Sequence, residues 1–249
     1  MSTWLFDLGN TRLKYAHRDA GGELGAMDSL GHHAGADFSE LPQAVRGEHA
    51  WISAVASPAI RAALLAELGP RFARISFART AARCDGLRIA YAAPARLGVD
   101  RFLSMLAARP AGESVLICGI GTALTLDLLD GQGRHHGGRI APSPTLMRES
   151  LSARARQLPA TGGDYVEFAG DTVDALASGC EGAALALIDH SRQAAARWLG
   201  TPPRLWLHGG GAAALLSRIH DAESRPRLVL EGLARYATLG DAIPPPHDR

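Results

Sequence analysis

Twice along this chain, a short apolar run ends at a glycine turn and the chain resumes as a second run of alternating polarity. The first copy is TWLFDL, then GN, then TRLKYAHR, which places Leu13 and Tyr15 on one face and Arg12 and Lys14 on the other. The second copy is SVLICGIGTALTLDLL, which follows the turn-rich segment RPAGE near residue 110. This plan is typical of a β-hairpin. The repeat therefore predicts two α/β halves that each begin with a hairpin.

Helical patterns follow the hairpin in both halves. In the first half, AWISAVAS predicts a strand, PAIRAALLAEL a helix with Pro58 in its first turn, and a second helix is expected from about Asp100 to Ala108. In the second half, the predicted order is a helix PTLMRESLSARARQL, a helix DTVDALASGCEGAALALIDHSRQAAARWLG, a strand RLWLHGGG, a helix AAALLSRIH, a strand RLVL and a last helical turn or two. We therefore predict two domains with mixed sheets, residues 1–112 and 113–249.

Charge and cysteine content exclude several classes of protein. The 249 residues contain 26 basic and 25 acidic side chains, so no overall field attracts nucleic acid or an anionic membrane. Cys84, Cys118 and Cys180 are widely spaced, which argues against both a disulfide framework and a zinc site. No leader peptide or membrane-spanning run is recognisable. We therefore expect a cytoplasmic protein that binds neither nucleic acid nor membrane.

Both hairpin turns have the composition of a phosphate-binding loop. Such a loop needs glycine for close backbone approach, together with hydroxyl or amide donors, and residues 9–11 and 121–122 supply both. Asp7 cannot bind phosphate itself, but it can hold a Mg²⁺ ion that bridges phosphate oxygens. Lys14, the only lysine of the chain, would project beside it. The alternative is an ordinary Asn-containing hairpin with a solvated lysine.

The segment YAAPARLGVDR carries a third candidate site. Asp100 and Arg101 precede the apolar run FLSMLAA, so Asp100 lies near a predicted helix start. Aspartate at that place is most often an N-cap. The functional alternative is a base that accepts the hydroxyl proton of a phosphoryl acceptor, with Arg101 binding a carboxylate or phosphate.

Other motifs favour different interpretations. No GxxxxGK[ST] motif is present, which excludes a P-loop kinase. In HGGGAA, Gly209, Gly211 and Ala214 satisfy a dinucleotide-binding pattern, with Glu231 at the end of the predicted strand RLVL as its acidic partner. A glycine-rich turn that packs against an adenine ring explains the same glycines.

Several polar residues are predicted to have structural roles only. The pairs His32–His33 and His135–His136 lie in Gly-rich segments, and we expect them in solvated loops. Asp127 and Asp130 flank a strand end before GQG, where a turn role is the default.

Taken together, these stretches resemble type III pantothenate kinase, a member of the actin-like ATPase superfamily with two ribonuclease-H-like domains and a nucleotide cleft between them. DLGNTRLK resembles the DxGNTxxK loop of the family, and YAAPARLGVDR its Tyr-x-x-Pro-x-x-Leu-Gly-x-Asp-Arg segment. GTALTLD and GGRIAP resemble its second phosphate region, DTVDALASG its Asn/Asp-Thr helix start, and LVLEGL its C-terminal signature. The resemblance covers nearly the whole chain.

The resemblance implies a reaction and a set of site residues. The reaction is phosphorylation of pantothenate by Mg²⁺-ATP, the first step of coenzyme A biosynthesis, with Asp100 as proton acceptor. ATP would be bound by Asp7, Leu8, Gly9, Asn10, Thr11, Arg12, Leu13, Lys14 and Thr122. Pantothenate would be bound by Tyr91, Gly98, Val99, Asp100, Arg101 and Thr172. Thr172 would reach the site from the partner subunit, so a homodimer is implied.

The chain departs from the family pattern at two places. In the family, an Asp in the form Asp-x-Gly-Thr ligates an activating K⁺ or NH₄⁺ ion, and Gly119 occupies that position here. The ion site is therefore either lost, or rebuilt from backbone carbonyls or another carboxylate. The segment APSP stands where the family commonly has Pro-Gly. Two other functions remain open: a transcriptional accessory factor of the same family, and a kinase of the same superfamily for another small alcohol or a sugar.

Overall fold

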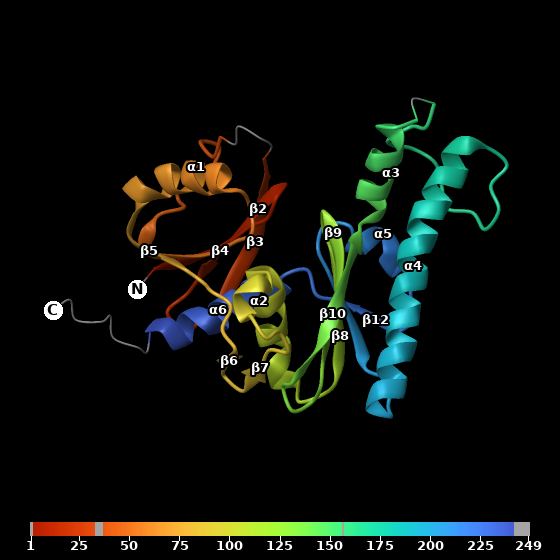
Figure 1. The fold of residues 1–249 in the computed structure, drawn as a ribbon. Coiled ribbons are helices and arrows are strands. Elements are labelled where there is room, and N and C mark those ends of the chain that lie inside the picture. The colour runs from red at the N-terminus through yellow and green to blue at the C-terminus, as the bar shows by residue number, and fades with distance from the viewer. Residues whose placement is uncertain (1, 33–36, 156, 242–249) are drawn as a thin grey trace. The chain divides into compact units, whose positions relative to one another are not determined.

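The computed structural model describes residues 2–32, 37–155 and 157–241, which form two compact units (Figure 1). One unit contains residues up to Pro110 together with those from Arg227 onward, and the other contains Ala111–Pro226. By its contacts, the C-terminal helix therefore belongs to the first unit, whereas the sequence pattern places it in the second predicted domain, residues 113–249.

The first unit is built on a five-stranded sheet of order β3-β2-β1-β4-β5. Strands β1, β2 and β3 pair antiparallel, and β1, β4 and β5 pair parallel. The elements of this unit are β1 (Thr3–Leu8), β2 (Arg12–Arg18), β3 (Leu24–Gly31), β4 (Gly47–Ala54), α1 (Pro58–Leu68), η1 (Gly69–Arg71), β5 (Phe72–Phe77), β6 (Arg83–Cys84), β7 (Leu87–Arg88), η2 (Pro94–Arg96), α2 (Val99–Ala108) and α6 (Leu228–Asp241), with η3 (Arg109–Ala111) at its edge.

The second unit repeats this plan. Its sheet has the order β10-β9-β8-β11-β12, with β8, β9 and β10 antiparallel and β8, β11 and β12 parallel. Its elements are β8 (Val115–Ile120), β9 (Ala123–Leu129), β10 (His135–Pro142), α3 (Pro144–Ser152), α4 (Thr172–Leu199), β11 (Arg204–His208), α5 (Ala212–Leu216) and β12 (Ala222–Ser224). The predicted repeat of a hairpin-led α/β half is confirmed, with two mixed sheets of one topology.

The helices begin where the sequence provides caps. The hydroxyl of Ser57 accepts a hydrogen bond from the N–H of Ile60 at the start of α1, and Pro58 follows in the first turn. At the start of α4, Asp171 Oδ1 accepts from the N–H groups of Val173 and Asp174 at 2.8 and 3.0 Å.

Two expectations about elements were wrong, and one strand was not predicted. RLVL does not form a strand, because Leu228 already lies in α6, and the fifth strand of the second sheet is Ala222–Ser224. Helix α3 ends at Ser152 and does not continue to the end of the predicted helix. The edge strand Leu24–Gly31 was not predicted, because its largely exposed side chains leave little hydrophobic pattern to detect.

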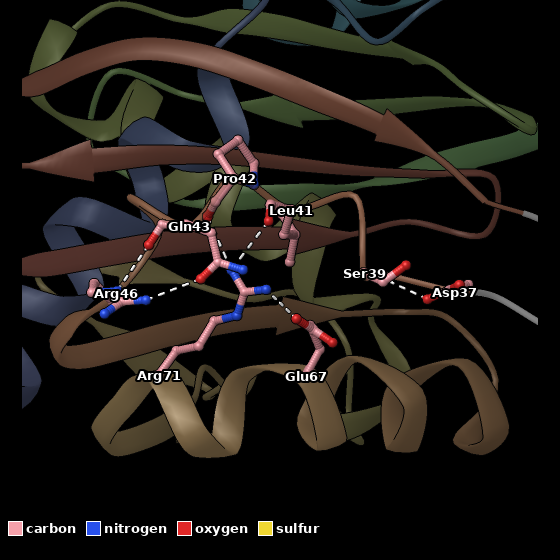
Figure 2. Close-up of polar contacts among 8 residues, drawn as sticks. All are labelled: Asp37, Ser39, Leu41, Pro42, Gln43, Arg46, Glu67 and Arg71. Carbon is pink, nitrogen blue, oxygen red and sulfur yellow. Dashed lines mark hydrogen bonds and ion pairs between the residues drawn. The ribbon is translucent and has the colours of Figure 1, made fainter.

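The loop before β4 is held in place by one arginine (Figure 2). The guanidinium of Arg71 donates to the carbonyls of Leu41 and Pro42 at 3.1 and 2.9 Å and pairs with Glu67 one helical turn earlier. Because buried backbone carbonyls need hydrogen-bond donors, these contacts let Leu41 enter the core of the first unit.

The two faces of the first sheet are covered by different helices. The face that carries Phe6, Leu8 and Ile52 forms one core with Leu64 and Leu68 of α1. On the other face, α6 contacts β1, β2 and β4, and α2 packs on α6. The two helices approach so closely at Gly232 that a Cβ there would lie 1.9 Å from the carbonyl oxygen of Leu103. This packing fixes α2, and with it Asp100, on the same face as Asp7.

Candidate active site

A row of three polar residues crosses the first sheet near the end of β1. Asp7 pairs with Lys14 on β2 and with Ser53 on β4. Because residues opposite each other in neighbouring strands point to the same face, the three side chains lie side by side. The hydroxyl of Ser53 donates to Asp7 Oδ1 at 3.1 Å. Asp7 is 8% exposed, so its carboxylate is largely removed from water.

The environment of Asp7 favours its neutral form. Burial and, to a smaller extent, the nearby Asp100 carboxylate raise the pKa of Asp7, Lys14 and the Ser53 hydrogen bond lower it, and the net result is a pKa of about 6. A carboxyl group that is buried beside a second carboxyl group is poised to take up a cation. Asp7 and Asp100, which are 93 positions apart in sequence, therefore form one acidic centre in the first unit.

The β1–β2 turn presents donors to solvent. The N–H of Gly9 donates to the carbonyl of Arg12 at 3.0 Å, and the side chains of Asn10 and Thr11 are exposed beyond it. A Cβ at Gly9 would lie 3.3 Å from the Arg12 carbonyl oxygen, so the tight turn favours glycine. The turn thus has the small residue and the free polar side chains that a phosphate loop requires.

His32 stabilises this turn from behind. It is 3% exposed, its Nε2 lies 3.0 Å from the Gly9 carbonyl and donates to it, and its backbone N–H donates to the Thr11 carbonyl at 2.9 Å. The expectation of a solvated loop histidine was therefore wrong for His32, while His33 lies outside the described residues. The sequence gives little signal for this role, because the contact joins residues 23 positions apart.

Asp100 lies in the first turn of α2 but does not cap it. The N-cap is Gly98, which has no side-chain cap, so the capping alternative for Asp100 is not supported. The Asp100 carboxylate folds back over Gly98, where a Cβ would lie 2.6 Å from Asp100 Oδ1. Gly98 therefore leaves the space in which the carboxylate sits.

Arg101 is buried beside Tyr91. Arg101 is only 6% exposed. Its Nη1 donates to the Tyr91 hydroxyl at 3.4 Å, and its guanidinium carbon lies 6.0 Å from the centre of the Tyr91 ring. A guanidinium held in one orientation suits bidentate binding of a carboxylate. The structure brings Tyr91, Gly98, Asp100 and Arg101 together with Asp7 and Lys14 in one unit.

The second unit carries the other predicted residues. Thr122 is exposed in the β8–β9 turn, where the Gly121 N–H donates to the Ala123 carbonyl at 3.0 Å, as Gly9 does to Arg12. Thr172 is the exposed first residue of α4, directly after the Asp171 cap. Their relation to the acidic centre of the first unit stays a prediction.

The second histidine pair was also predicted wrongly. His135 is 1% exposed on β10, and its Nε2 lies 3.1 Å from Oδ1 of the equally buried Asp127. His136 Nε2 lies 2.7 Å from Asp130 Oδ2. The turn role of Asp130 is confirmed, since its Oδ1 accepts from the N–H groups of Gln132 and Arg134. For Asp127 the turn role was wrong, because the residue lies within β9 and pairs with His135.

The dinucleotide interpretation of HGGGAA is also wrong. Glu231 lies in the first turn of helix α6 rather than at a strand end. The glycines have a packing reason: Gly209 has φ +96°, and a Cβ there would lie 2.3 Å from the Ile120 carbonyl oxygen. A Cβ at Gly211 would lie 2.6 Å from the Ile120 side chain.

Comparison with known proteins assigns the family. The model of the family described as type III pantothenate kinase matches residues 4–194. The chain is 54% identical to the type III pantothenate kinase of Stenotrophomonas maltophilia strain K279a, over 95% of this chain and 98% of that one. It is 55% identical to the protein of the same name from Xanthomonas euvesicatoria, over 96% and 98%. This chain belongs to the type III pantothenate kinase family.

Solved structures support the fold of this pantothenate kinase. A protein described as a Baf family transcriptional activator from Campylobacter jejuni aligns with a TM-score of 0.62 at 17% identity, covering 96% of this chain and 100% of that one. One described as a 2-dehydro-3-deoxygalactonokinase from Sinorhizobium meliloti aligns with a TM-score of 0.57 at 14% identity, covering 98% and 99%. At these identities the likeness concerns the fold alone, and it agrees with the predicted two-domain α/β class.

A type III pantothenate kinase is a phosphotransferase, and the family implies ATP and pantothenate as substrates. Among the described residues, no helix is long and apolar enough to cross a membrane. In the same part of the chain, no group of three or more His, Cys, Asp or Glu is placed to hold a metal ion. Mg²⁺ at phosphoryl-transfer sites usually keeps several waters and uses only one or two carboxylates besides phosphate. The buried carboxylate of Asp7 therefore fits such a site.

The residues around Gly119 do not fit the monovalent cation that the resemblance implies. A Cβ at Gly119 would lie 2.7 Å from Thr125 Oγ1 and 2.9 Å from His208 Nε2. The space that a carboxylate would need is therefore filled by other side chains, one of which presents nitrogen rather than oxygen.

Gly98→Ala is expected to lower kcat by roughly tenfold or more, because it would displace Asp100, the proton acceptor that the resemblance implies, and misplacement of such a group removes most of its effect. The added methyl group displaces the Asp100 carboxylate, while φ −53° and ψ 136° at Gly98 are accessible to alanine. Steady-state kinetics and thermal denaturation check this. Gly69→Ala is the matched control, since a Cβ there meets nothing within 4 Å. Equal kcat in the two variants would contradict the expectation.

Proposed function

We propose that this chain transfers the γ-phosphoryl group of ATP to the terminal hydroxyl of pantothenate, giving ADP and 4′-phosphopantothenate, with Asp100 as the proton acceptor. The observation that carries this proposal is the acidic centre of the first unit. Asp100 lies close enough to Asp7 to raise the pKa of Asp7, and the exposed phosphate-type turn begins directly after β1. One carboxylate can thus serve the nucleotide while the other serves the acceptor.

The reaction needs positioning more than strong base catalysis. Phosphoryl transfer has a loose transition state, so the acceptor hydroxyl keeps its proton until late, and the base has only to be aligned with it. Asp100 lies in the first turn of α2, where a negative charge interacts favourably with the helix dipole. Arg101 would bind the pantothenate carboxylate and so orient the opposite end of the substrate.

The nucleotide would be held by the hairpin turns. In the first unit, the N–H groups and side chains of residues 9–12 would bind phosphate oxygens, and Lys14 would balance their charge. In the second unit, Thr122 would contact the same phosphates, and the turn at Gly210 would pack against the adenine ring. Mg²⁺, held by Asp7 directly or through water, would supply charge neutralisation at the phosphates.

We further propose a homodimer in which Thr172 contributes to the pantothenate site of the partner. Exposed apolar side chains near the start of α4 support this, since Phe168 is 98% exposed and Val173 and Leu151 are also exposed. A cavity of about 460 Å³ lies between α3 and α4, lined by Pro142, Met147, Ser150, Leu151, Ala175, Leu176, Gly179 and Cys180. Apolar surface of this kind marks an association site.

A single set of measurements tests the proposed function. ADP release coupled to NADH oxidation should depend on pantothenate, and mass spectrometry should detect the phosphorylated product. Pantothenate should be preferred over sugars and other small alcohols, and sedimentation should give a dimer. ADP formation with a sugar but not with pantothenate would instead favour the sugar kinase alternative.

A further inference from the structure

The second sheet has a polar row that is the counterpart of Asp7, Lys14 and Ser53. Gly119 pairs with Thr125 on β9 and with His208 on β11. Gly119 stands one residue before the end of β8, as Asp7 does in β1, and the two sheets share one topology. Gly119 is therefore the structural equivalent of Asp7, Thr125 of Lys14, and His208 of Ser53.

His208 is directed at Gly119 by rigid backbone. The next residue, Gly209, has φ +96° and lies against the Ile120 backbone, and the Gly211 N–H donates to the Ile120 carbonyl at 3.0 Å. Two atoms of the imidazole, Nε2 and Cε1, would lie 2.9 and 3.1 Å from a Cβ on Gly119. The ring thus fills the place that a longer side chain at position 119 would occupy.

The exchange of side chains has a chemical consequence. K⁺ is held in proteins by shells of oxygen atoms, whereas this row offers one hydroxyl, at Thr125, and a ring edge of nitrogen and carbon. With glycine at position 119 the row itself carries no carboxylate, and the nearest acidic side chain along β9, the buried Asp127, is paired with His135. The imidazole instead occupies the space beside Gly119 that a carboxylate side chain would need.

We infer that His208 takes the place of the monovalent-cation site in this chain, and that its kinase reaction proceeds equally well in Na⁺ and K⁺. This inference rests on the proposed function only for its kinetic part. The structural part, that the row around Gly119 binds no K⁺, stands without any assumption about catalysis.

The first experiment compares cations on the unmodified protein. Thermal denaturation in KCl, NaCl and tetramethylammonium chloride of equal ionic strength should give the same Tm, because an ion that bound the native state would raise it. Tl⁺, used as a K⁺ probe, should show no saturable broadening of its ²⁰⁵Tl resonance. The rate of pantothenate-dependent ADP formation should agree within about twofold between Na⁺ and K⁺, because an ion that does not bind the protein cannot stabilise the transition state. A Tm increase specific to K⁺, or a fivefold or larger rate difference, would overturn the inference.

The second experiment restores the missing groups. In the double variant Gly119→Asp with His208→Ala, a carboxylate enters the space that the imidazole leaves, and K⁺ should now raise Tm and broaden the ²⁰⁵Tl resonance. His208→Ala alone is the matched control, and it should gain no K⁺ response because it has space without a carboxylate. A double variant that folds and ignores K⁺ would count against the assigned place of His208.

The two proposals fail in different ways. A protein that phosphorylates nothing in any salt would refute the proposed function, while the Tm and ²⁰⁵Tl measurements would still decide the cation question. If the double variant does not fold, the comparison of salts on the unmodified protein decides it alone.

Discussion

Asp100→Asn is expected to lower kcat for pantothenate phosphorylation by roughly 10²- to 10⁴-fold, the range typical of removing a general base. The amide keeps the size and most of the hydrogen bonding of the carboxylate but cannot accept the hydroxyl proton. KM for ATP should change little, because the nucleotide is assigned to other residues. Steady-state kinetics with varied ATP and pantothenate measure both values.

The stability of this variant separates a catalytic from a structural role. Replacing Asp100 removes one of the charges that raise the pKa of Asp7, so the variant should be no less stable than the unmodified protein at neutral pH. Asp189→Asn, an exposed change on α4, is the matched control and should leave kcat unaltered. An Asp100→Asn protein with full turnover would exclude the proposed base.

Asp7→Asn is expected to abolish most of the turnover and, at the same time, to stabilise the nucleotide-free protein. Turnover falls because the carboxylate assigned to Mg²⁺-ATP is lost. Stability rises because an ionised, buried carboxylate beside Asp100 is removed. With a pKa of about 6 in the folded protein against 3.8 as the ordinary value, ionisation costs the native state on the order of 2–3 kcal/mol at pH 8.

The sign of this effect fixes its pH dependence. Because the pKa of Asp7 is raised by folding, the stabilising contribution of its protonated form is complete below about pH 4 and is lost as the pH rises through 6. The Asn variant does not titrate, so its Tm advantage should be near zero at pH 4 and should reach roughly 5 °C above pH 7.

Thermal denaturation between pH 4 and 8 measures this advantage. Asp37→Asn is a control of opposite sign, since hydrogen bonds from Ser39 lower the pKa of the Asp37 carboxyl. It should give no stabilisation at neutral pH. An Asp7→Asn protein that is less stable than the unmodified one at pH 8 would contradict the assigned environment.

Local sequence patterns predicted the parts of the site that are continuous in the chain. The β1–β2 turn and the start of α4 were readable because turns and caps depend on a few adjacent residues. Residues that act through neighbouring strands or a returning loop were missed. Ser53, His32 and His208 reach their partners across 46, 23 and 89 positions, and no periodicity carries such information.

Burial explains why other residues were given the wrong role from the sequence. His135 and Asp127 read as solvated or turn residues because polar side chains usually are, yet they satisfy each other inside the second unit. The run RLVL read as a strand because a short apolar run does not distinguish a buried strand from the start of a helix.

The sequence by itself determined the family and the doubled hairpin-led plan, and it singled out Asp7, Lys14, Asp100 and Arg101 as candidate site residues, because each depends on short motifs whose order along the chain is enough. The tertiary structure decided which groups meet. Sheet register places Ser53 on Asp7, the packing of α2 on α6 brings Asp100 to the same face, and register in the second sheet sets His208 against Gly119. Charge interaction and steric exclusion act over a few ångströms of space, and only the folded chain sets those distances.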